Sequence, residues 1–172
     1  NTVISMAIGQ GELLLTPIQM ANMTAIIANR GFYYTPHIIK EISGQENIDT
    51  NFTKKQYCSI EAKYFEPIID GMLKVTIGED GTAQNSQITN LDICGKTGTA
   101  ENPHGEDHSI FIAFAPKDNP KIAIAVYVEN GGWGSTWAAP IASLMIDKYI
   151  NKNISNSHQE RFILDGTLIA ED

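Results

Sequence analysis

Residues 94–100 read Cys-Gly-Lys-Thr-Gly-Thr-Ala and stand shortly before two apolar runs, which together decide the fold of this 172-residue chain. The runs are Ile-Phe-Ile-Ala-Phe-Ala at 110–115 and Lys-Ile-Ala-Ile-Ala-Val-Tyr-Val-Glu at 121–129. The five residues between them, Pro-Lys-Asp-Asn-Pro at 116–120, are turn formers, and so short a polar connection predicts an antiparallel hairpin. A strand over 92–99 should precede this hairpin in the same sheet.

Both apolar runs carry apolar side chains at odd and even positions alike. A strand of this kind is buried on both faces, so helices should cover both sides of the sheet. The small side chains of Ala123 and Ala125 indicate that a helix backbone lies close to one face. We therefore predict an α+β fold, with a mainly antiparallel β-sheet flanked by helices on both faces.

Two segments before the sheet have the pattern of helices. The first begins at Thr16-Pro17-Ile18-Gln19, a capping box with proline in the first turn, and ends before Gly31. Because it is apolar nearly all round, we expect it to be buried within a larger domain. The second should run from about 62 to 77, with an uncertain start because Pro67 is tolerated only near the first turn. Its predicted inner face comprises Ile68, Ile69, Met72, Leu73 and Thr76.

A last helix should follow the glycine turn at 130–134 and cover the face of the sheet opposite the Pro17 helix. Ser135 or Thr136 is its expected cap, and Pro140 falls in its first turn. Its predicted core-facing residues are Ile141, Leu144, Met145 and Tyr149. Elsewhere, the sequence predicts short strands at 32–35 and 38–42, a polar loop at 43–55 and a polar surface tail over 151–172.

The composition excludes several classes of protein. With 42% hydrophobic and 19% charged residues, the chain is an ordinary globular sequence. Its net charge of −8 argues against a nucleic-acid partner, so an anionic ligand must be held by one or two local cations. Cys58 and Cys94 are too few for a disulfide framework; they can pair or stay free, and we favour the free state. The chain opens on Asn1 without a methionine, which suggests a piece of a longer protein.

The segment Lys96-Thr97-Gly98-Thr99 has the chemistry of a carboxylate site. The Lys96 ammonium and the hydroxyls of Thr97 and Thr99 suit a terminal carboxylate, and Gly98 would let a ligand backbone approach as an added strand. The Thr99 amide N–H could then stabilise charge on a reacting carbonyl oxygen. A strand end with a turn glycine explains the same four residues, and their pattern alone leaves both explanations open.

Other chemical candidates are weaker. The cluster His104-Gly105-Glu106-Asp107-His108 reads as a loop before a strand and lacks the helical spacing usual for paired metal ligands, so we expect no metal and no cofactor. Ser109 lacks a lysine at the required spacing, and Ser135 lacks a Gly-x-Ser-x-Gly frame. Trp133 and Trp137 flank the glycine turn, where packing is the default and a peptide contact stays open.

Further segments agree with one family in order as well as in kind. They are Ile8-Gly9-Gln10-Gly11-Glu12, Thr16-Pro17-Ile18-Gln19-Met20-Ala21, Gly71-Met72, Gly81-Thr82-Ala83, Gly95-Lys96-Thr97-Gly98-Thr99-Ala100, Asp107-His108-Ser109, Phe114-Ala115-Pro116 and Val128-Glu129-Asn130-Gly131-Gly132. With them, residues 4–150 resemble the C-terminal part of the transpeptidase domain of class B penicillin-binding proteins, closest to the penicillin-binding protein 2 group of cell elongation. The resemblance implies a partial β-lactamase/transpeptidase-like fold over 1–150, with 151–172 as a polar tail.

The resemblance also implies roles. Lys96, Thr97 and Gly98 match the family's third motif: Lys96 would tune proton transfer, Thr97 and Thr99 would bind the carboxylate, and the Thr99 N–H would be an oxyanion donor. The reaction would be serine acyl transfer on the D-Ala-D-Ala end of peptidoglycan stem peptides, with β-lactams trapped at the acyl stage. The implied partners are cell-elongation membrane proteins, at the periplasmic face of the inner membrane, with an N-terminal anchor outside this chain.

The sequence departs from the family pattern in one respect. It contains no Ser-x-x-Lys and no Ser-x-Asn, so the nucleophile and its lysine would lie upstream of Asn1, and we expect the isolated chain to be inactive. Two alternatives stay open: a non-catalytic sensor of β-lactams or peptides with the same fold, and a docking module for cell-wall synthesis partners in which the tail after residue 150 is the interaction segment.

Overall fold

The computed structural model describes residues 2–7, 9, 12–41, 43 and 49–168. Its centre is an antiparallel sheet of β3 (Cys94–Ala100), β4 (His108–Ala115) and β5 (Ile122–Val128), in the order β3-β4-β5. The register places Lys96 opposite Ile112 and Ile112 opposite Ala125. The predicted hairpin and the strand before it are confirmed. Within the described residues, β3 is an edge strand of this sheet.

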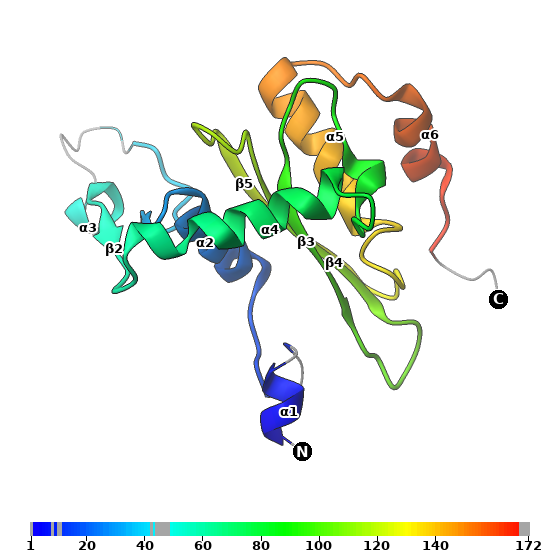
Figure 1. Cartoon of the computed structure of the whole chain (residues 1–172), viewed down its shortest axis with the longest axis horizontal. Coiled ribbons are helices and arrows are strands. Elements are labelled where there is room, and N and C mark those ends of the chain that lie inside the picture. The colour runs from blue at the N-terminus through cyan, green and yellow to red at the C-terminus, as the bar shows by residue number, and fades with distance from the viewer. Residues whose placement is uncertain (1, 8, 10–11, 42, 44–48, 169–172) are drawn as a thin grey trace.

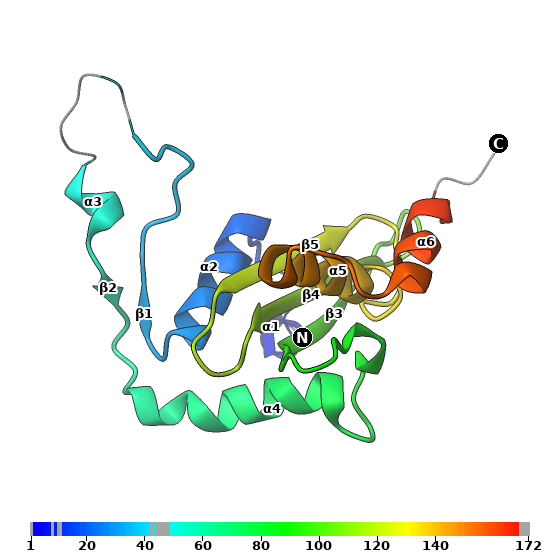
Figure 2. The same ribbon diagram turned by 90° about the horizontal axis from the view of Figure 1, so that it is seen from above.

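Helices cover both faces of the sheet, as predicted (Figures 1 and 2). On one face, α2 (Pro17–Ala28) packs against β5 and β4 while α4 (Glu66–Ile77) lies along β3. On the other face, α5 (Ala138–Asn151) packs against β4 and β5. Phe114 contributes to the α2/α4 core and Phe111 to the α5 core, and both side chains are fully buried. Phe111 and Phe114, three residues apart on β4, thus belong to two separate cores on opposite faces of the sheet.

The sequence correctly locates α2. The Thr16 backbone N–H donates to Gln19 Oε1 at 2.8 Å, as the capping box requires, and the chain turns at Arg30 and Gly31. Its alanine side lies on β5, where Ala28 and Ala123 belong to one core. The opposite side is open in this chain, with Ile18 59% exposed, and its burial within a larger domain stays a prediction.

The start of α4 resolves the question raised by Pro67. A 3₁₀ turn, η1 (Ala62–Tyr64), precedes the helix, and Pro67 is its second residue, where no backbone N–H is needed. Ile69, Met72 and Thr76 are buried as predicted, but Ile68 is 52% exposed, which corrects that assignment. Two ion pairs fasten α4 to its neighbours: Arg30 Nε to Glu66 at 2.9 Å, and Lys117 Nζ to Asp70 at 2.7 Å. The hydrogen bond from Lys117 lowers the pKa of Asp70.

The start of α5 differs from the prediction. Neither Ser135 nor Thr136 caps the helix, whose N-cap position is Trp137 without a side-chain cap. Instead, the buried Ser109 of β4 accepts a hydrogen bond from the Ala138 N–H at 3.1 Å and donates one to the Trp133 carbonyl at 2.9 Å. Ser109, which is distant in sequence, therefore satisfies backbone groups at the start of α5 in place of a local N-cap residue.

The inner face of α5 also differs in part. Leu144 is buried, as predicted, while Met145 and Tyr149 are 53% and 52% exposed. The helix meets the sheet through small side chains, because the residues of α5 in the core cluster are Ala138, Ala139, Ala142 and Ile146. The face of α5 predicted from its large apolar residues is therefore rotated about the helix axis relative to the face that packs on the sheet.

The remaining segments are short. Helix α1 (Thr2–Ala7) lies apart from the sheet (Figure 1), and β1 (Phe32–Tyr33) pairs with β2 (Gln56–Tyr57). Residues 38–41 form no strand, contrary to prediction, and the predicted loop at 43–55 contains the short helix α3 (Thr50–Thr53). Ile42, residues 44–48, and Ile8, Gln10 and Gly11 of the first family segment fall outside the described residues.

The segment predicted as a polar surface tail after residue 150 has secondary structure of its own. It contains α6 (Ser157–Asp165), which packs back on the chain through stacked rings of Phe162 and Trp137, with centroids 5.3 Å apart. Asp147 anchors the connection, because Ser155 and Asn151 donate hydrogen bonds to its carboxylate. Burial would raise the pKa of Asp147, but these hydrogen bonds outweigh burial and lower it.

One finding concerns membranes. Across the part of the chain that the structure describes, no helix combines the length and the apolar character needed to cross a bilayer.

The role of Ser109 gives a testable prediction. Ser109→Ala should lower the free energy of unfolding by about 1–3 kcal/mol, because the Ala138 N–H and the Trp133 carbonyl lose a buried partner. Ser135→Ala, which removes the cap expected from the sequence, should change it by less than about 0.5 kcal/mol. Urea unfolding of both variants measures the difference. Equal losses, or a larger loss for Ser135→Ala, would contradict this account of how α5 begins.

Candidate functional site

The exposed side of β3 carries the cation that the sequence singled out. Lys96 lies on the solvent-exposed part of the strand, and its Nζ donates to the Thr97 carbonyl at 2.8 Å. It borders a pocket of about 390 Å³ between β3, the C-terminal half of α4 and the following loop. The residues lining this pocket are Gly71, Lys74, Val75, Gly78, Glu79, Asp80, Gly81, Thr82 and Lys96. Lys96 is therefore exposed to solvent and borders a pocket.

Thr97 and Thr99 lie on the opposite face of β3 from Lys96 and Gly98, as strand alternation predicts. Thr97 is opposite Phe111, on the side that α5 covers, and it is only partly buried. Its hydroxyl reaches the edge of the sheet, where Thr97 Oγ1 and Thr82 Oγ1 form a hydrogen bond of 2.8 Å. Since Thr82 lines the same pocket as Lys96, it links the Thr97 hydroxyl to that pocket, although Lys96 and Thr97 point to different faces of the strand.

Glycines let the surrounding backbone approach β3 closely. A Cβ atom on Gly95 would collide with the Phe111 ring, and one on Gly134 would collide with the carbonyl oxygens of Ile110 and Gly98. The glycine turn after β5 therefore lies directly on the sheet beside Gly98. A Cβ on Gly98 itself would come within 3.3 Å of Ile110 Cβ, so this glycine is constrained by its neighbouring strand as well as by any ligand.

The remaining candidates from the sequence take up positions around the end of the hairpin. His104 lies in the loop between β3 and β4, and His108 begins β4, where its Nδ1 accepts a hydrogen bond from the Asn130 N–H at 3.1 Å. Ser109 is buried and serves α5. Trp137 packs on Phe162, whereas Trp133 is 73% exposed and borders the glycine turn.

Sequence reasoning missed Thr82 as a site residue. Gly81-Thr82-Ala83 was noted as a family segment, but nothing in its spacing indicates a partner 15 residues away. Only the fold brings the loop after α4 against the edge of β3.

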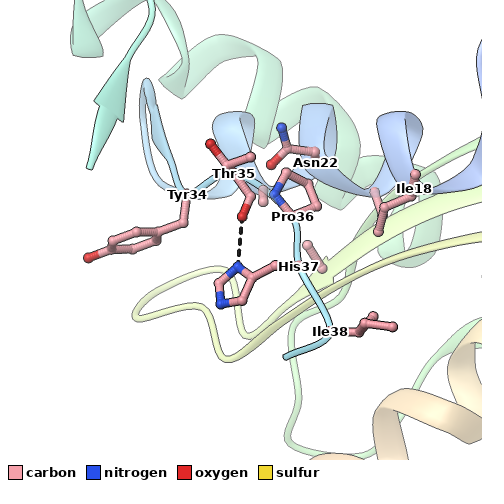
Figure 3. A pocket seen from close by; sticks show the side chains of 10 residues that line it. Ile18, Asn22, Tyr34, Thr35, Pro36, His37 and Ile38 are labelled. Atoms are coloured by element: carbon pink, nitrogen blue, oxygen red, sulfur yellow. Dashed lines mark hydrogen bonds between the residues drawn. The ribbon is translucent and has the colours of Figure 1, made fainter. Parts of the chain in front are cut away.

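A second hollow, of about 470 Å³, lies between α2 and the extended residues 34–38 (Figure 3). Ile18, Pro36 and Ile38 give it an apolar wall, and His37 Nδ1 lies 2.9 Å from the Thr35 carbonyl, with which it forms a hydrogen bond. Its ionisable side chains are His37 and Tyr34, and neither makes a hydrogen bond to a nucleophile or a carboxylate in the described structure. The hollow suits apolar packing better than catalysis.

The start of β3 is sealed. Cys94 is fully buried in the α2/α4 core, and burial raises the pKa of its thiol from 9.0 to about 12. Both cysteines are free, and Cys58 is only partly buried. Cys94 therefore anchors the strand as a small apolar residue and supplies no thiolate.

Comparison with known proteins agrees with this geometry. Residues 1–147 match the family model described as the penicillin binding protein transpeptidase domain. The chain belongs to this family. The peptidoglycan D,D-transpeptidase MrdA of Haemophilus influenzae is 34% identical over 169 residues, an alignment that covers 88% of this chain and 26% of that protein. This chain thus spans about a quarter of the length of that transpeptidase.

Solved structures of the family are similar as well. The crystal structure of Pseudomonas aeruginosa PBP2 in complex with WCK 5153 matches with a TM-score of 0.75 at 35% identity, covering 91% of this chain and 35% of that one. The imipenem acyl-enzyme complex of penicillin-binding protein A from Mycobacterium tuberculosis matches with a TM-score of 0.63 at 32% identity, covering 74% and 29%. The complex between PBP2 and MreC from Helicobacter pylori matches with a TM-score of 0.71 at 30% identity, covering 87% and 27%.

Membership of this transpeptidase family confirms the resemblance seen in the sequence, and its α+β fold is the predicted one. The described transpeptidase segment brings Lys96 and Thr97 together with Thr82, while Gly98 and Thr99 continue the same strand. Their individual roles in binding and catalysis stay predictions.

The buried thiol gives a second prediction. At pH 9, where more than half of ordinary cysteine thiols are ionised, the raised pKa leaves the Cys94 thiol almost wholly protonated, so iodoacetamide should modify Cys58 and spare Cys94 in the folded protein. The ionised fraction of Cys94 rises only as the pH approaches 12. Mass spectrometry of the alkylated peptides measures both sites, and urea should make them equally reactive. Equal alkylation without urea would contradict the burial of this end of β3.

Proposed function

We propose that the protein containing this chain is a peptidoglycan D,D-transpeptidase, and that β3 is the strand that holds its acyl donor. The observation that carries the proposal is that Lys96 and Thr82 line one pocket at the edge of β3, where the Thr82 hydroxyl is hydrogen-bonded to that of Thr97. In a chain of net charge −8, this local cation is what makes the edge attractive to an anion. Thr97 and Thr99 would hold the terminal carboxylate of the donor, and Gly98 would let its backbone lie against β3.

The same strand orientation supports Thr99 as an oxyanion donor. In a strand, residues two apart direct their backbone groups toward the same edge. Lys96 Nζ reaches the Thr97 carbonyl, which favours the outer edge of the sheet for the backbone groups of both Thr97 and Thr99. The Thr99 N–H would then stabilise the charge that develops on the carbonyl oxygen when serine attacks.

The nucleophile has to come from another part of a longer polypeptide. The 172 residues contain no Ser-x-x-Lys, and they span about a quarter of MrdA from Haemophilus influenzae. Within the proposal, a serine of the remaining domain attacks the D-Ala-D-Ala peptide bond and forms an ester, and terminal D-Ala leaves. The amine of a neighbouring stem peptide then displaces the serine and forms the cross-link. Lys96 would lie near this serine and assist proton transfer.

Partners and location follow by analogy with the relatives. The match to an imipenem acyl-enzyme complex supports β-lactams as inhibitors that acylate the same serine. The match to the complex between PBP2 and MreC supports a comparable protein partner for the full-length protein. A role in cell elongation at the periplasmic face of the inner membrane is proposed from the family resemblance of the sequence. Stem peptides are the proposed substrate, and the net charge of −8 argues against a nucleic-acid partner.

The alternatives receive less support. A docking module would use the segment after residue 150 as a free interaction segment, but α6 packs on Trp137 and its Gln159 side chain donates to the Asn85 carbonyl. A non-catalytic sensor differs from a transpeptidase only in turnover, because both would be acylated by penicillin.

The test uses fluorescent penicillin with the full-length protein and with residues 1–172 alone. The full-length protein should be labelled covalently, and the isolated chain should not be labelled because it lacks the serine. Lys96→Ala in the full-length protein should slow acylation by about 100-fold, the scale of a proton-transfer contribution, while the exposed Lys121→Ala leaves it unchanged. Gel fluorescence against time gives the rates.

Efficient labelling of the isolated chain would show that the nucleophile is misassigned. Unchanged kinetics in Lys96→Ala would remove Lys96 from the mechanism. Cross-linking of stem peptides by the full-length protein separates the transpeptidase from the sensor, which would be acylated but would form no cross-link.

A further inference from the structure

Thr82 occupies a position that the carboxylate role of Thr97 leaves unexplained. Its hydroxyl lies 2.8 Å from that of Thr97, and it comes from the loop after α4, not from the strand. In the described structure, Thr82 is the residue whose side chain forms a hydrogen bond with the Thr97 side chain.

The loop holds Thr82 from both sides. Before it, Gly81 lies so close to the end of α4 that a Cβ atom would come within 2.6 Å of the Val75 carbonyl oxygen and 2.7 Å of that of Lys74. After it, the fully buried Ala83 donates its N–H to the same Val75 carbonyl at 2.9 Å. The backbone of Thr82 is therefore fixed to the last turn of α4, which itself packs along β3.

Amide side chains brace the same loop. Gln84 Nε2 donates to the carbonyls of Gly78 and Glu79 at 2.7 and 2.6 Å, and Gln87 Nε2 donates to the Thr76 carbonyl at 2.6 Å. In the 3₁₀ helix η2 (Gln84–Ser86), Asn85 Nδ2 donates to the Ser135 carbonyl of the glycine turn at 2.8 Å. These bonds hold the backbone of the loop, so that the exposed Thr82 lies where its hydroxyl reaches that of Thr97.

In a hydrogen bond between two hydroxyls, one hydroxyl donates its proton and the other accepts it. A threonine hydroxyl has one proton to donate and two lone pairs that accept. If Thr97 gives its proton to a carboxylate, the bond between the two residues can form only with Thr82 as donor and Thr97 Oγ1 as acceptor. Accepting that bond polarises the Thr97 hydroxyl and strengthens its own donation to the anion.

We propose that Thr82 is a positioning residue that orients and polarises the Thr97 hydroxyl for the carboxylate of the acyl donor. The inference rests on the proposed function, since it takes Thr97 as the residue that binds this carboxylate. Thr82 acts through Thr97 and makes no contact of its own with the donor. The geometry thus extends the carboxylate site from β3 to the loop after α4.

The experiment measures acylation of the full-length protein by benzylpenicillin and by benzylpenicillin methyl ester, which lacks the carboxylate charge. Thr82→Val, which removes the hydroxyl and keeps the shape, should lower the second-order rate constant for the acid by about 3- to 10-fold, the scale of one net hydrogen bond. Thr82→Ser, which keeps a hydroxyl, should be acylated by the acid at about the wild-type rate. The rate with the ester should not change, whereas a merely structural defect would slow both compounds.

A double mutant separates an indirect role from a direct one. If Thr82 acts through Thr97, the variant Thr82→Val/Thr97→Val should be acylated at the rate of Thr97→Val alone. Thr89→Val, at an exposed position in the turn after η2, is the control and should behave as wild type. Thermal unfolding of each variant reports folding, and Thr82→Ala repeats the test if the valine is poorly tolerated.

The possible failures are distinguishable. If Thr97→Val slows the acid but Thr82→Val does not, or if the two losses multiply in the double mutant, the positioning role is wrong and the proposed function stands. An equal loss with the ester also overturns the positioning role. If the wild-type protein is not acylated, or Thr97→Val has no effect, the carboxylate site on β3 is wrong and the role of Thr82 falls with it.

Discussion

Burial of β4 on both faces is the constraint on which the rest of the structure depends. Phe111 and Phe114 are fully buried on opposite sides of one strand, beneath α5 on one side and beneath α2 and α4 on the other. This central strand fixes the position of β3 through a register of seven residue pairs, from Cys94 with Phe114 to Ala100 with His108. The outer edge of β3 remains accessible, so the candidate site residues sit on a rigid support.

The site combines residues that lie on opposite faces of β3. The Lys96 ammonium and the Thr97 hydroxyl would point apart on an isolated strand, and the loop after α4 resolves the separation because Thr82 touches Thr97 and shares a pocket with Lys96. That loop is in turn joined to the glycine turn through Asn85 and Ser135, and to α6 through the hydrogen bond from Gln159 to Asn85. A continuous set of contacts thus links the C-terminal helix to the strand that carries the site.

The sequence predicts those features whose cause is local. The hairpin, the two-faced sheet and the start of α2 follow from periodicity and from capping residues that are neighbours in the chain. Three features that the sequence did not predict share a different cause, because each depends on partners that are distant in sequence. The cap of α5 is Ser109, from a strand 29 residues earlier. The polar α6 is held by Trp137 and Asn85, and Thr82 finds Thr97 only after α4 has packed along β3.

The account is tested most directly by a crystal structure of the full-length protein acylated with benzylpenicillin. We expect the carboxylate of the bound drug within about 3.0 Å of Thr97 Oγ1, with the hydrogen bond between Thr97 and Thr82 still in place and the Lys96 ammonium bordering the same pocket. A carboxylate bound away from β3, with the Thr97 hydroxyl making no contact with the drug, would contradict the claim that this strand holds the acyl donor.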